Sequence, residues 1–134
     1  MTHTQKTYHS NGQIKTIYDT VNGEKHGKFI RYFDNGQIAI ISTYVHGKSH
    51  GQWKEYYENG QIAEEGEYID GEYHVTNFWV ETGDQLLVNG TGKVIRKYSP
   101  TEGEVFEQYF DNGKFTVEKK ISGASYGKFM RDAE

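Results

Sequence analysis

The six histidines are the side chains of this 134-residue chain best suited to bind a metal ion. Three of them, His26, His50 and His74, recur at intervals of 24 residues. Equivalent residues of successive β-hairpins lie two strands, or roughly 10 Å, apart, so these imidazoles cannot all reach one ion whose ligands lie about 2.0–2.1 Å away. His46 and His50 could meet across one turn, but no further ligand accompanies them. We predict no metal site and expect these histidines to cap backbone groups or pack on aromatic rings.

No combination of residues in the sequence is typical of an enzyme. Glu64 and Glu65 could form an acid–base pair, but neighbours in a strand point to opposite faces. No serine lies in the Gly-x-Ser-x-Gly motif of a nucleophile elbow. Gly90-Thr91-Gly92-Lys93 has the composition of a phosphate-binding loop without its spacing or its following helix, which favours a β-turn. We predict no catalytic residue, no cofactor and a non-enzymatic function.

The strongest candidate site is an acidic block interleaved with aromatic residues. Residues 55–84 contain nine acids and no lysine or arginine. Aromatic side chains supply contact area in protein interfaces, and complementary charge speeds docking with a basic partner. The alternative is that the charges serve solubility and the rings form the core. The predicted partner-binding residues are Trp53, Glu55, Tyr56, Glu64, Glu65, Glu67, Tyr68, Asp70, Glu72 and Trp79.

A repeat of 24 residues sets the elements that must position these side chains. The run Tyr32 to Ala39 reappears at residues 56–63 and, more loosely, at 8–15. A fixed period of this length indicates a repeat architecture. Each copy contains Asn-Gly between alternating apolar residues, which predicts a two-residue hairpin turn with both residues at positive φ. These dipeptides are Asn11-Gly12, Asn35-Gly36, Asn59-Gly60 and Asn112-Gly113.

A second signal, Gly-x-x-His-Gly, predicts another turn in each repeat. It occurs at residues 23–27 and 47–51, and recurs with Val75 for the last glycine and, at 123–127, with Tyr126 for the histidine. The last position of this signal falls at residues 27, 51, 75, 103 and 127, so the intervals are 24, 24, 28 and 24 residues. We interpret the long interval as an extra short hairpin or a lengthened loop. The prediction is one domain, 1–134, with regular units at about 8–75, a degenerate or inserted segment at 76–102, and the last units at 103–130.

Composition indicates an all-β chain. Eleven tyrosines, 16 glycines, a single proline and a hydrophobic fraction of 34% are typical of short strands between tight turns. We predict an antiparallel β-hairpin meander of some eleven strands, as a single-layer or curled sheet. Helix is expected to be negligible, with only residues 126–134 ambiguous.

Charge and hydropathy limit the partners. A net charge of −4 and a pI of about 5.9 argue against binding to nucleic acid or to anionic lipid. No apolar run approaches the roughly 20 residues of a membrane span, and the first residues lack the pattern of a secretory signal. With no cysteine in the chain, we expect a cytoplasmic protein.

The repeats resemble MORN repeats, specifically their bacterial variant form. Residues 66–74 follow the family order Gly-x-aromatic-x-x-Gly-x-x-His, and the Asn-Gly-Gln-Ile signature of the variant form occurs at 11–14, 35–38 and 59–62. The resemblance implies a β-hairpin meander that acts as an interaction module. Many small stand-alone proteins of this type resemble YwqK-like antitoxin or immunity proteins, which are thought to neutralise a toxin.

Three functions follow as hypotheses. The first is an immunity or antitoxin protein that binds a toxin or another basic protein partner. The second is a membrane-associated or scaffolding module, as in other MORN arrays, and the acidic pI makes membrane binding the weaker alternative. The third is a carbohydrate-active or carbohydrate-binding protein. Open backbone edges near Tyr8 and near Phe129 also predict that two copies could pair as a homodimer.

Overall fold

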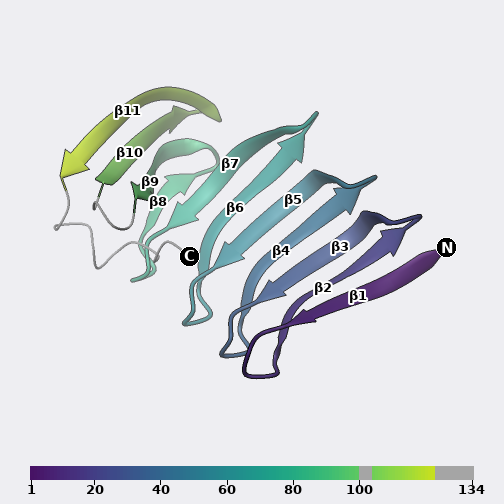
Figure 1. The fold of residues 1–134 in the computed structure, drawn as a ribbon. Coiled ribbons are helices and arrows are strands. Elements are labelled where there is room, and N and C mark those ends of the chain that lie inside the picture. Colours follow the sequence, from purple (N-terminus) through teal and green to yellow (C-terminus); the bar gives the residue numbers. More distant parts are fainter. Residues whose placement is uncertain (100–103, 123–134) are drawn as a thin grey trace. The chain divides into compact units, whose positions relative to one another are not determined.

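The computed structural model describes residues 1–99 and 104–122, and in this part of the chain the regular structure consists of β-strands (Figure 1). Their hydrogen-bonded order follows the sequence, with antiparallel pairing. The predicted all-β hairpin meander of eleven strands is therefore confirmed. The strands are β1 (Thr2–Tyr8), β2 (Ile14–Val21), β3 (Glu24–Tyr32), β4 (Ile38–Val45), β5 (Lys48–Tyr56), β6 (Ile62–Ile69), β7 (Glu72–Trp79), β8 (Gln85–Val88), β9 (Thr91–Ser99), β10 (Glu104–Asp111) and β11 (Lys114–Ser122).

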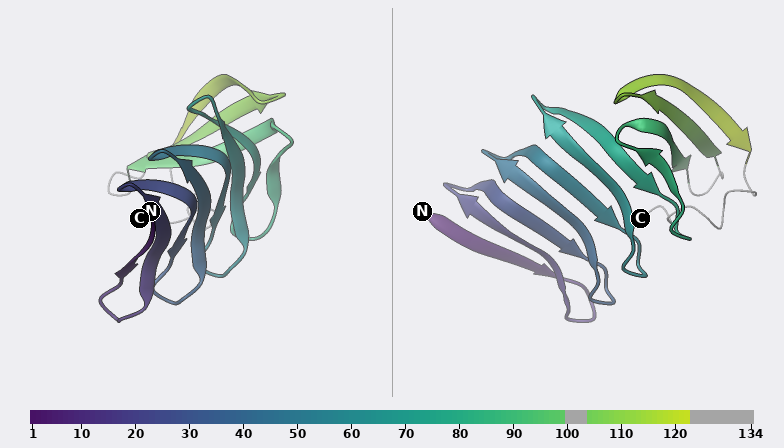
Figure 2. Two further views of the ribbon diagram at one scale, coloured as in Figure 1. Left: turned by 90° about the vertical axis from the view of Figure 1, so that its right-hand side faces the viewer. Right: turned by 180° about the vertical axis from the view of Figure 1, so that it is seen from behind.

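The chain forms two compact units, Met1–His74 and Val75–Glu134, and β7 runs through their boundary. In the first unit, β1 to β6 lie side by side in one layer (Figures 1 and 2). The predictions for residues 123–134, namely the last Gly-x-x-His-Gly signal, the ambiguous helix and the edge at Phe129, lie outside the described residues. That residues 1–134 act as a single domain stays a prediction.

The Asn-Gly dipeptides of the first unit do not form the predicted two-residue turns. Asn11, Asn35 and Asn59 are not at positive φ, whereas the glycines after them are. The chain turns instead through five residues: the His9 N–H donates to the Gln13 carbonyl at 2.8 Å, and the same bond closes residues 33–37 and 57–61. The prediction is correct for Asn112-Gly113, where φ is 49° and 83°.

The asparagine side chain explains why these loops differ. In each loop its Oδ1 accepts a hydrogen bond from the backbone N–H two residues later, at 2.9 Å, so the side chain closes the loop itself. Its Nδ2 then donates to the next repeat, from Asn11 to the Asp34 carbonyl at 2.8 Å and from Asn35 to the Glu58 carbonyl at 3.1 Å. The Asn-Gly-Gln signature therefore links neighbouring repeats as well as turning the chain.

Asn35→Ala removes both the bond that closes its loop and the bond to the next repeat. We expect a loss of about 1–2 kcal/mol in the free energy of unfolding, because each hydrogen bond contributes about 0.5–1.5 kcal/mol. Asn59→Ala is the matched control, since Asn59 closes its loop but makes no bond to a following repeat within the described residues. Urea unfolding followed by circular dichroism measures both variants. Equal losses would show that the bond between repeats contributes nothing.

The two-residue turns lie at the opposite ends of the strands. They are formed by Asn22-Gly23, His46-Gly47 and Asp70-Gly71, with φ near 50° at the first residue and 80–84° at the glycine. The Gly-x-x-His-Gly signal therefore begins in a turn, as predicted, but its second half lies within a strand. Gly27 and Gly51, at φ 99° and 72°, belong to β3 and β5, where the pairing with β2 and β4 shifts register. These positions are β-bulges, a conformation that glycine tolerates.

The described part of the segment predicted to be degenerate or inserted, 76–102, ends at residue 99. The two-residue turns have their glycines at positions 71, 90 and 113, so their spacing there is 19 and then 23 residues. Residues 80–84 form the same closed loop as the earlier repeats, with Val80 N–H donating to the Asp84 carbonyl at 2.9 Å. The following strand, β8, has only four residues. The described part of this segment is thus a shortened repeat. The turn predicted at Gly103 lies outside the described residues, and an extra short hairpin or a lengthened loop stays a prediction.

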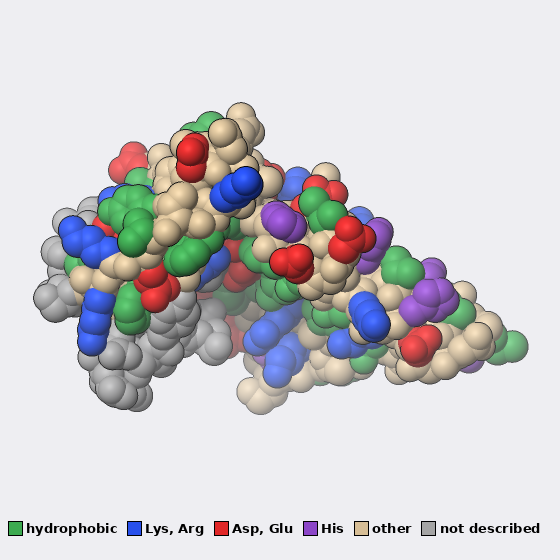
Figure 3. All heavy atoms as spheres, turned by 90° about the horizontal axis from the view of Figure 1, so that it is seen from above, with side chains coloured by type: hydrophobic (Ala, Val, Ile, Leu, Met, Phe, Trp, Pro, Cys, Tyr) green, Lys and Arg blue, Asp and Glu red, His purple; other side chains and the backbone are tan. Residues whose placement is uncertain are grey.

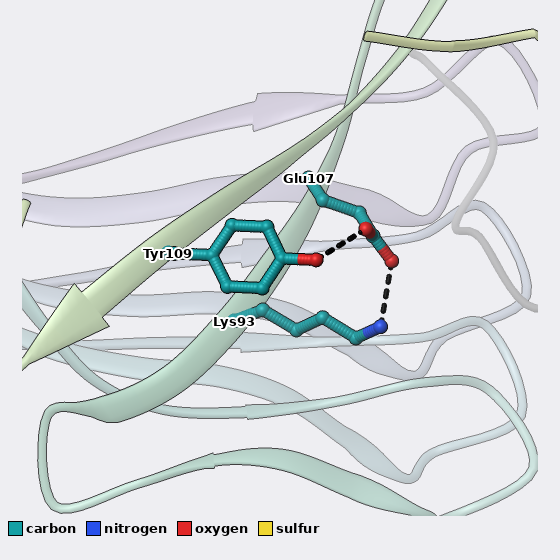
Figure 4. A network of polar contacts seen from close by, with 3 residues as sticks. All are labelled: Lys93, Glu107 and Tyr109. Atoms are coloured by element: carbon teal, nitrogen blue, oxygen red, sulfur yellow. Dashed lines mark hydrogen bonds and ion pairs between the residues drawn. The ribbon is translucent and has the colours of Figure 1, made fainter. Parts of the chain in front are cut away.

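The described residues of the second unit include a conventional apolar core and one buried charged residue. Leu87 and Val94 are fully buried, and Phe78 and Val105 nearly so. Among them lies Glu107, which is 3% exposed. Its carboxylate accepts hydrogen bonds of 2.6 Å from Lys93 Nζ and from the Tyr109 hydroxyl, as Figure 4 shows. A buried carboxylate is tolerated when it is paired and hydrogen-bonded in this way.

Lys93→Met removes the cationic partner of this carboxylate and leaves the apolar part of the side chain. Breaking a buried ion pair costs about 3–5 kcal/mol, and we expect about 2–3 kcal/mol here because the Lys93 side chain is 30% exposed. Tyr109→Phe, which removes one hydrogen bond to the same carboxylate, is expected to cost about 1–2 kcal/mol. Chemical unfolding of both variants measures the difference. A larger loss for Tyr109→Phe would contradict this assignment.

Candidate partner-binding face

One line of residues crosses the first unit from β2 to β6 on a single face. Tyr18 pairs with Phe29, Phe29 with Ser42, Ser42 with Trp53, and Trp53 with Gly66. Directly paired residues of an antiparallel sheet have their side chains on the same face. The register therefore places the rings of Tyr18, Phe29 and Trp53 on the same side of the layer.

Further rings extend this line into two clusters of three rings each, which together we call the aromatic row. Its members touch at centroid distances of 5.4 Å for Tyr18–Phe29, 5.5 Å for Phe29–Tyr44 and 5.9 Å for Trp53–Tyr68. Tyr73 contacts Trp53 at 6.2 Å and Tyr68 at 5.1 Å. All of these rings are half-buried, so each keeps part of its surface open to solvent. The row consists of Tyr18, Phe29, Tyr44, Trp53, Tyr68 and Tyr73.

Lys25 places a positive charge over the first half of the row. Its Nζ lies 5.2 Å from the Tyr18 centroid, 5.1 Å from that of Phe29 and 5.2 Å from that of Tyr44. An ammonium within about 6 Å of a ring centroid is attracted by the negative face of the ring, by about 0.5–1 kcal/mol at an exposed site. These three rings therefore already hold a cation supplied by the chain itself.

Carboxylates accompany the second half of the row. Glu55 accepts a hydrogen bond from Trp53 Nε1 at 3.2 Å, and Glu64 accepts one from the Tyr73 hydroxyl at 2.7 Å. The two glutamates are directly paired across β5 and β6, so they share the face of the row. Glu64 is 1% exposed, whereas Glu55 is half-buried.

Tyr73 can reach Glu64 because residue 66 is a glycine. A Cβ built on Gly66 would overlap the ring and hydroxyl of Tyr73. Gly66 does not adopt a positive φ, so the requirement for glycine here is one of space alone. The glycine that begins the family-like run at residues 66–74 thus serves the packing of the aromatic row.

Gly66→Ala is expected to displace Tyr73 and to destabilise the protein by about 1–3 kcal/mol, as overpacking does. In a Tyr73→Ser background the alanine at position 66 has no ring to overlap with. We expect Gly66→Ala to lower the free energy of unfolding by less than about 0.5 kcal/mol there. Serine is the residue at the equivalent position, 49, of the preceding repeat. Urea unfolding of the two single variants and the double variant measures the coupling. Additive effects would show that the ring does not fill this space.

The structure divides the predicted binding residues between several places. Four of them lie together on the face of the row: Trp53, Glu55, Glu64 and Tyr68. Glu65 and Glu67 lie on the opposite face, where Glu65 is 3.6 Å from Lys54 Nζ and Glu67 pairs with Gln52. Asp70 and Glu72 are exposed at the β6–β7 turn, Tyr56 is half-buried at the end of β5, and Trp79 belongs to the second unit. Whether any of them binds a partner stays a prediction.

The prediction missed the first half of the row. Tyr18, Lys25, Phe29 and Tyr44 lie before the acidic block on which it was based. The signal was present in the sequence, because Phe29 and Tyr44 stand 24 residues before Trp53 and Tyr68. Aligning the repeats by position would have joined the two halves.

The histidines lie mainly at the ends of the strands that carry the two-residue turns, and Figure 3 shows several of them exposed there. The His26 and His46 rings are 5.3 Å apart, and the His46 N–H donates to His26 Nδ1 at 3.4 Å. Glu24 lies 3.8 Å from His46 Nδ1. Among the described side chains, no group of three or more histidines, cysteines or acids is placed to hold a metal ion. The pair that forms is thus His26 with His46, instead of His46 with His50.

The geometry of the repeats agrees with a sequence family. The MORN repeat variant family matches residues 4–22, 25–46 and 49–70. The family model thus matches three consecutive repeats of the first unit. Each match covers one strand–turn–strand segment, since β1–β2 is followed by β3–β4 and β5–β6. The aromatic row thus lies within the matched segments, apart from Tyr73, which follows the last of them.

The other comparisons add no relative: no curated protein and no solved structure matches the chain. Within residues 1–99 and 104–122, no helix is long and apolar enough to cross a membrane. MORN repeats are in general modules that interact with proteins or membranes, and they are typically non-enzymatic.

Proposed function

We propose that this protein is a non-enzymatic, cytoplasmic protein-binding module of the immunity or antitoxin type, which binds a basic protein partner through the aromatic row. The observation that carries the proposal is the set of six half-buried rings on one face of the MORN repeats, with carboxylates beside its second half. Aromatic anchors in the centre of an interface account for much of its binding energy. The half-exposed rings offer such anchors already in place.

Charge supports a basic partner. The protein carries a net charge of −4, and the acids are concentrated in residues 55–84, which contribute β6 and the β6–β7 turn. Opposite charge on a partner raises the rate of association and disfavours acidic competitors. A toxin with a basic surface has this chemistry. Pairing of two copies through exposed strand edges, of which β1 is exposed along its whole length, stays a prediction.

The test begins with the products of the neighbouring reading frames, produced singly and measured by calorimetry against this protein. For the partner that binds, Tyr68→Thr is expected to weaken the affinity by about thirtyfold, the effect of losing an anchor worth about 2 kcal/mol. Threonine occupies the equivalent position, Thr20, in the first repeat. Co-expression then tests whether the protein relieves the toxicity of that partner.

Glu67→Lys is the matched control, because Glu67 lies on the opposite face and is exposed. It is expected to leave the affinity within about twofold, apart from a change in association rate. The reverse outcome, with Glu67→Lys harmful and Tyr68→Thr harmless, would place the interface on the opposite face. Binding of oligosaccharides or anionic vesicles that depends on Tyr68, with no protein partner, would contradict the proposal.

A further inference from the structure

Successive MORN repeats differ in charge at equivalent positions on the face of the aromatic row. Lys25, Arg31 and Ile40 of one copy correspond, 24 residues later, to Ser49, Glu55 and Glu64. The register joins Arg31, Ile40, Glu55 and Glu64 into one line across β3 to β6, beside the line of rings. The basic residues Lys25 and Arg31 are thus replaced by a serine and a glutamate in the second copy. Ile40 is replaced by a second glutamate, Glu64.

The rings themselves are repeated with the same geometry. Phe29 and Tyr44 are 5.5 Å apart at an interplanar angle of 61°, and their equivalents Trp53 and Tyr68 are 5.9 Å apart at 62°. In the first copy, Lys25 Nζ lies over the ring pair. In the second copy the position of Lys25 is occupied by Ser49, which cannot supply a cation. The same ring pair therefore appears once with an ammonium from its own chain and once without it.

Two further features of the second copy suit a positively charged ligand. Glu55 is bound to the Trp53 indole and shares the face of the rings, so it places negative charge beside them. Ser42 pairs directly with Trp53, is 2% exposed, and its Oγ has no hydrogen-bond partner among the described residues. A buried hydroxyl without a partner is costly, and a donor from a ligand would relieve that cost.

We infer that Trp53 and Tyr68, with Ser42, Ser49 and Glu55, form a subsite for a basic side chain of the protein partner, held over the two rings as Lys25 is held over Phe29 and Tyr44. The inference rests on the proposed function and deepens it, because it names the chemical group that the partner must present. The rings attract the cation through their negative faces. Glu55 supplies the countercharge that offsets its loss of hydration.

The experiment uses the full chain and a capped pentalysine peptide, with capped pentaglutamine as the neutral control peptide. Binding is followed by the NMR shift of the Trp53 indole N–H signal, assigned from its loss in Trp53→Phe. Pentalysine is expected to shift this signal saturably, and pentaglutamine is expected to leave it unchanged. Ser49→Lys, which reproduces the arrangement at Lys25, is expected to weaken pentalysine binding at least about tenfold.

Gln52→Lys is the matched control for charge, since residue 52 is exposed on the opposite face and the substitution changes the net charge by the same amount. It is expected to leave the Trp53 shift and the affinity nearly unchanged. Equal weakening by Ser49→Lys and Gln52→Lys would overturn the inference, because the effect would then be one of overall charge. Glu55→Gln, which keeps an acceptor for the Trp53 indole, is expected to weaken binding at least threefold. This variant decides the matter if Ser49→Lys does not fold.

The outcomes separate this inference from the proposed function. If a protein partner binds wild type and Ser49→Lys equally, the module binds proteins but the subsite is refuted. If pentalysine binds as expected while no protein partner binds, the subsite stands and the proposed function fails. Absence of any pentalysine-dependent shift at millimolar concentration would refute the subsite directly.

Discussion

The first unit depends on one constraint: a sheet in which β1 to β6 form a single layer has little interior in which to bury apolar side chains. Its buried apolar residues are Ala39, Tyr57 and Ala63, and two of these are alanines. Burial must then come from contacts between neighbouring side chains on one face. Large flat rings suit this arrangement, because each can cover part of the next across a strand spacing of about 4.8 Å. The aromatic row is thus a stabilising element as well as an exposed surface.

The same constraint explains the bonds between repeats. Where strands gain little from an apolar interior, hydrogen bonds at both ends can hold successive hairpins in register. Asn11 and Asn35 supply them at one end, and at the other the Gly47 N–H donates to the Lys25 carbonyl at 2.9 Å. Close approach accompanies these bonds, since a Cβ at Gly36 would lie 3.0 Å from Gln13 Oε1. The asparagine, glycine and glutamine of the signature therefore each have a separate physical role.

Sequence alone predicted the class of fold, the repeat and the number of strands, because hairpin turns and a fixed period leave few alternatives. It failed on turn type, since an asparagine side chain that bonds to its own loop competes with the backbone conformation expected of Asn-Gly. It also grouped acidic residues of both faces into one candidate site. The block was chosen by the density of acids along the chain, whereas alternation along β6 places Glu64 on one face and Glu65 and Glu67 on the other. Glu64 was predicted to contact a partner, but nothing local in the sequence indicated the tyrosine nine residues later that covers it.

The same hydrogen bond occurs in two successive repeats. It runs from Asn11 to the Asp34 carbonyl and, 24 residues later in the sequence, from Asn35 to the Glu58 carbonyl. A repeat that contacts both neighbours in the same way can be duplicated or deleted without the need for new contacts between repeats. The number of repeats in such an array is therefore free to vary between related chains. The side chains that carry charge on the ring face take no part in these two asparagine bonds. Duplication followed by exchange of a few side chains could therefore give one scaffold a series of differently charged surfaces, each one period long.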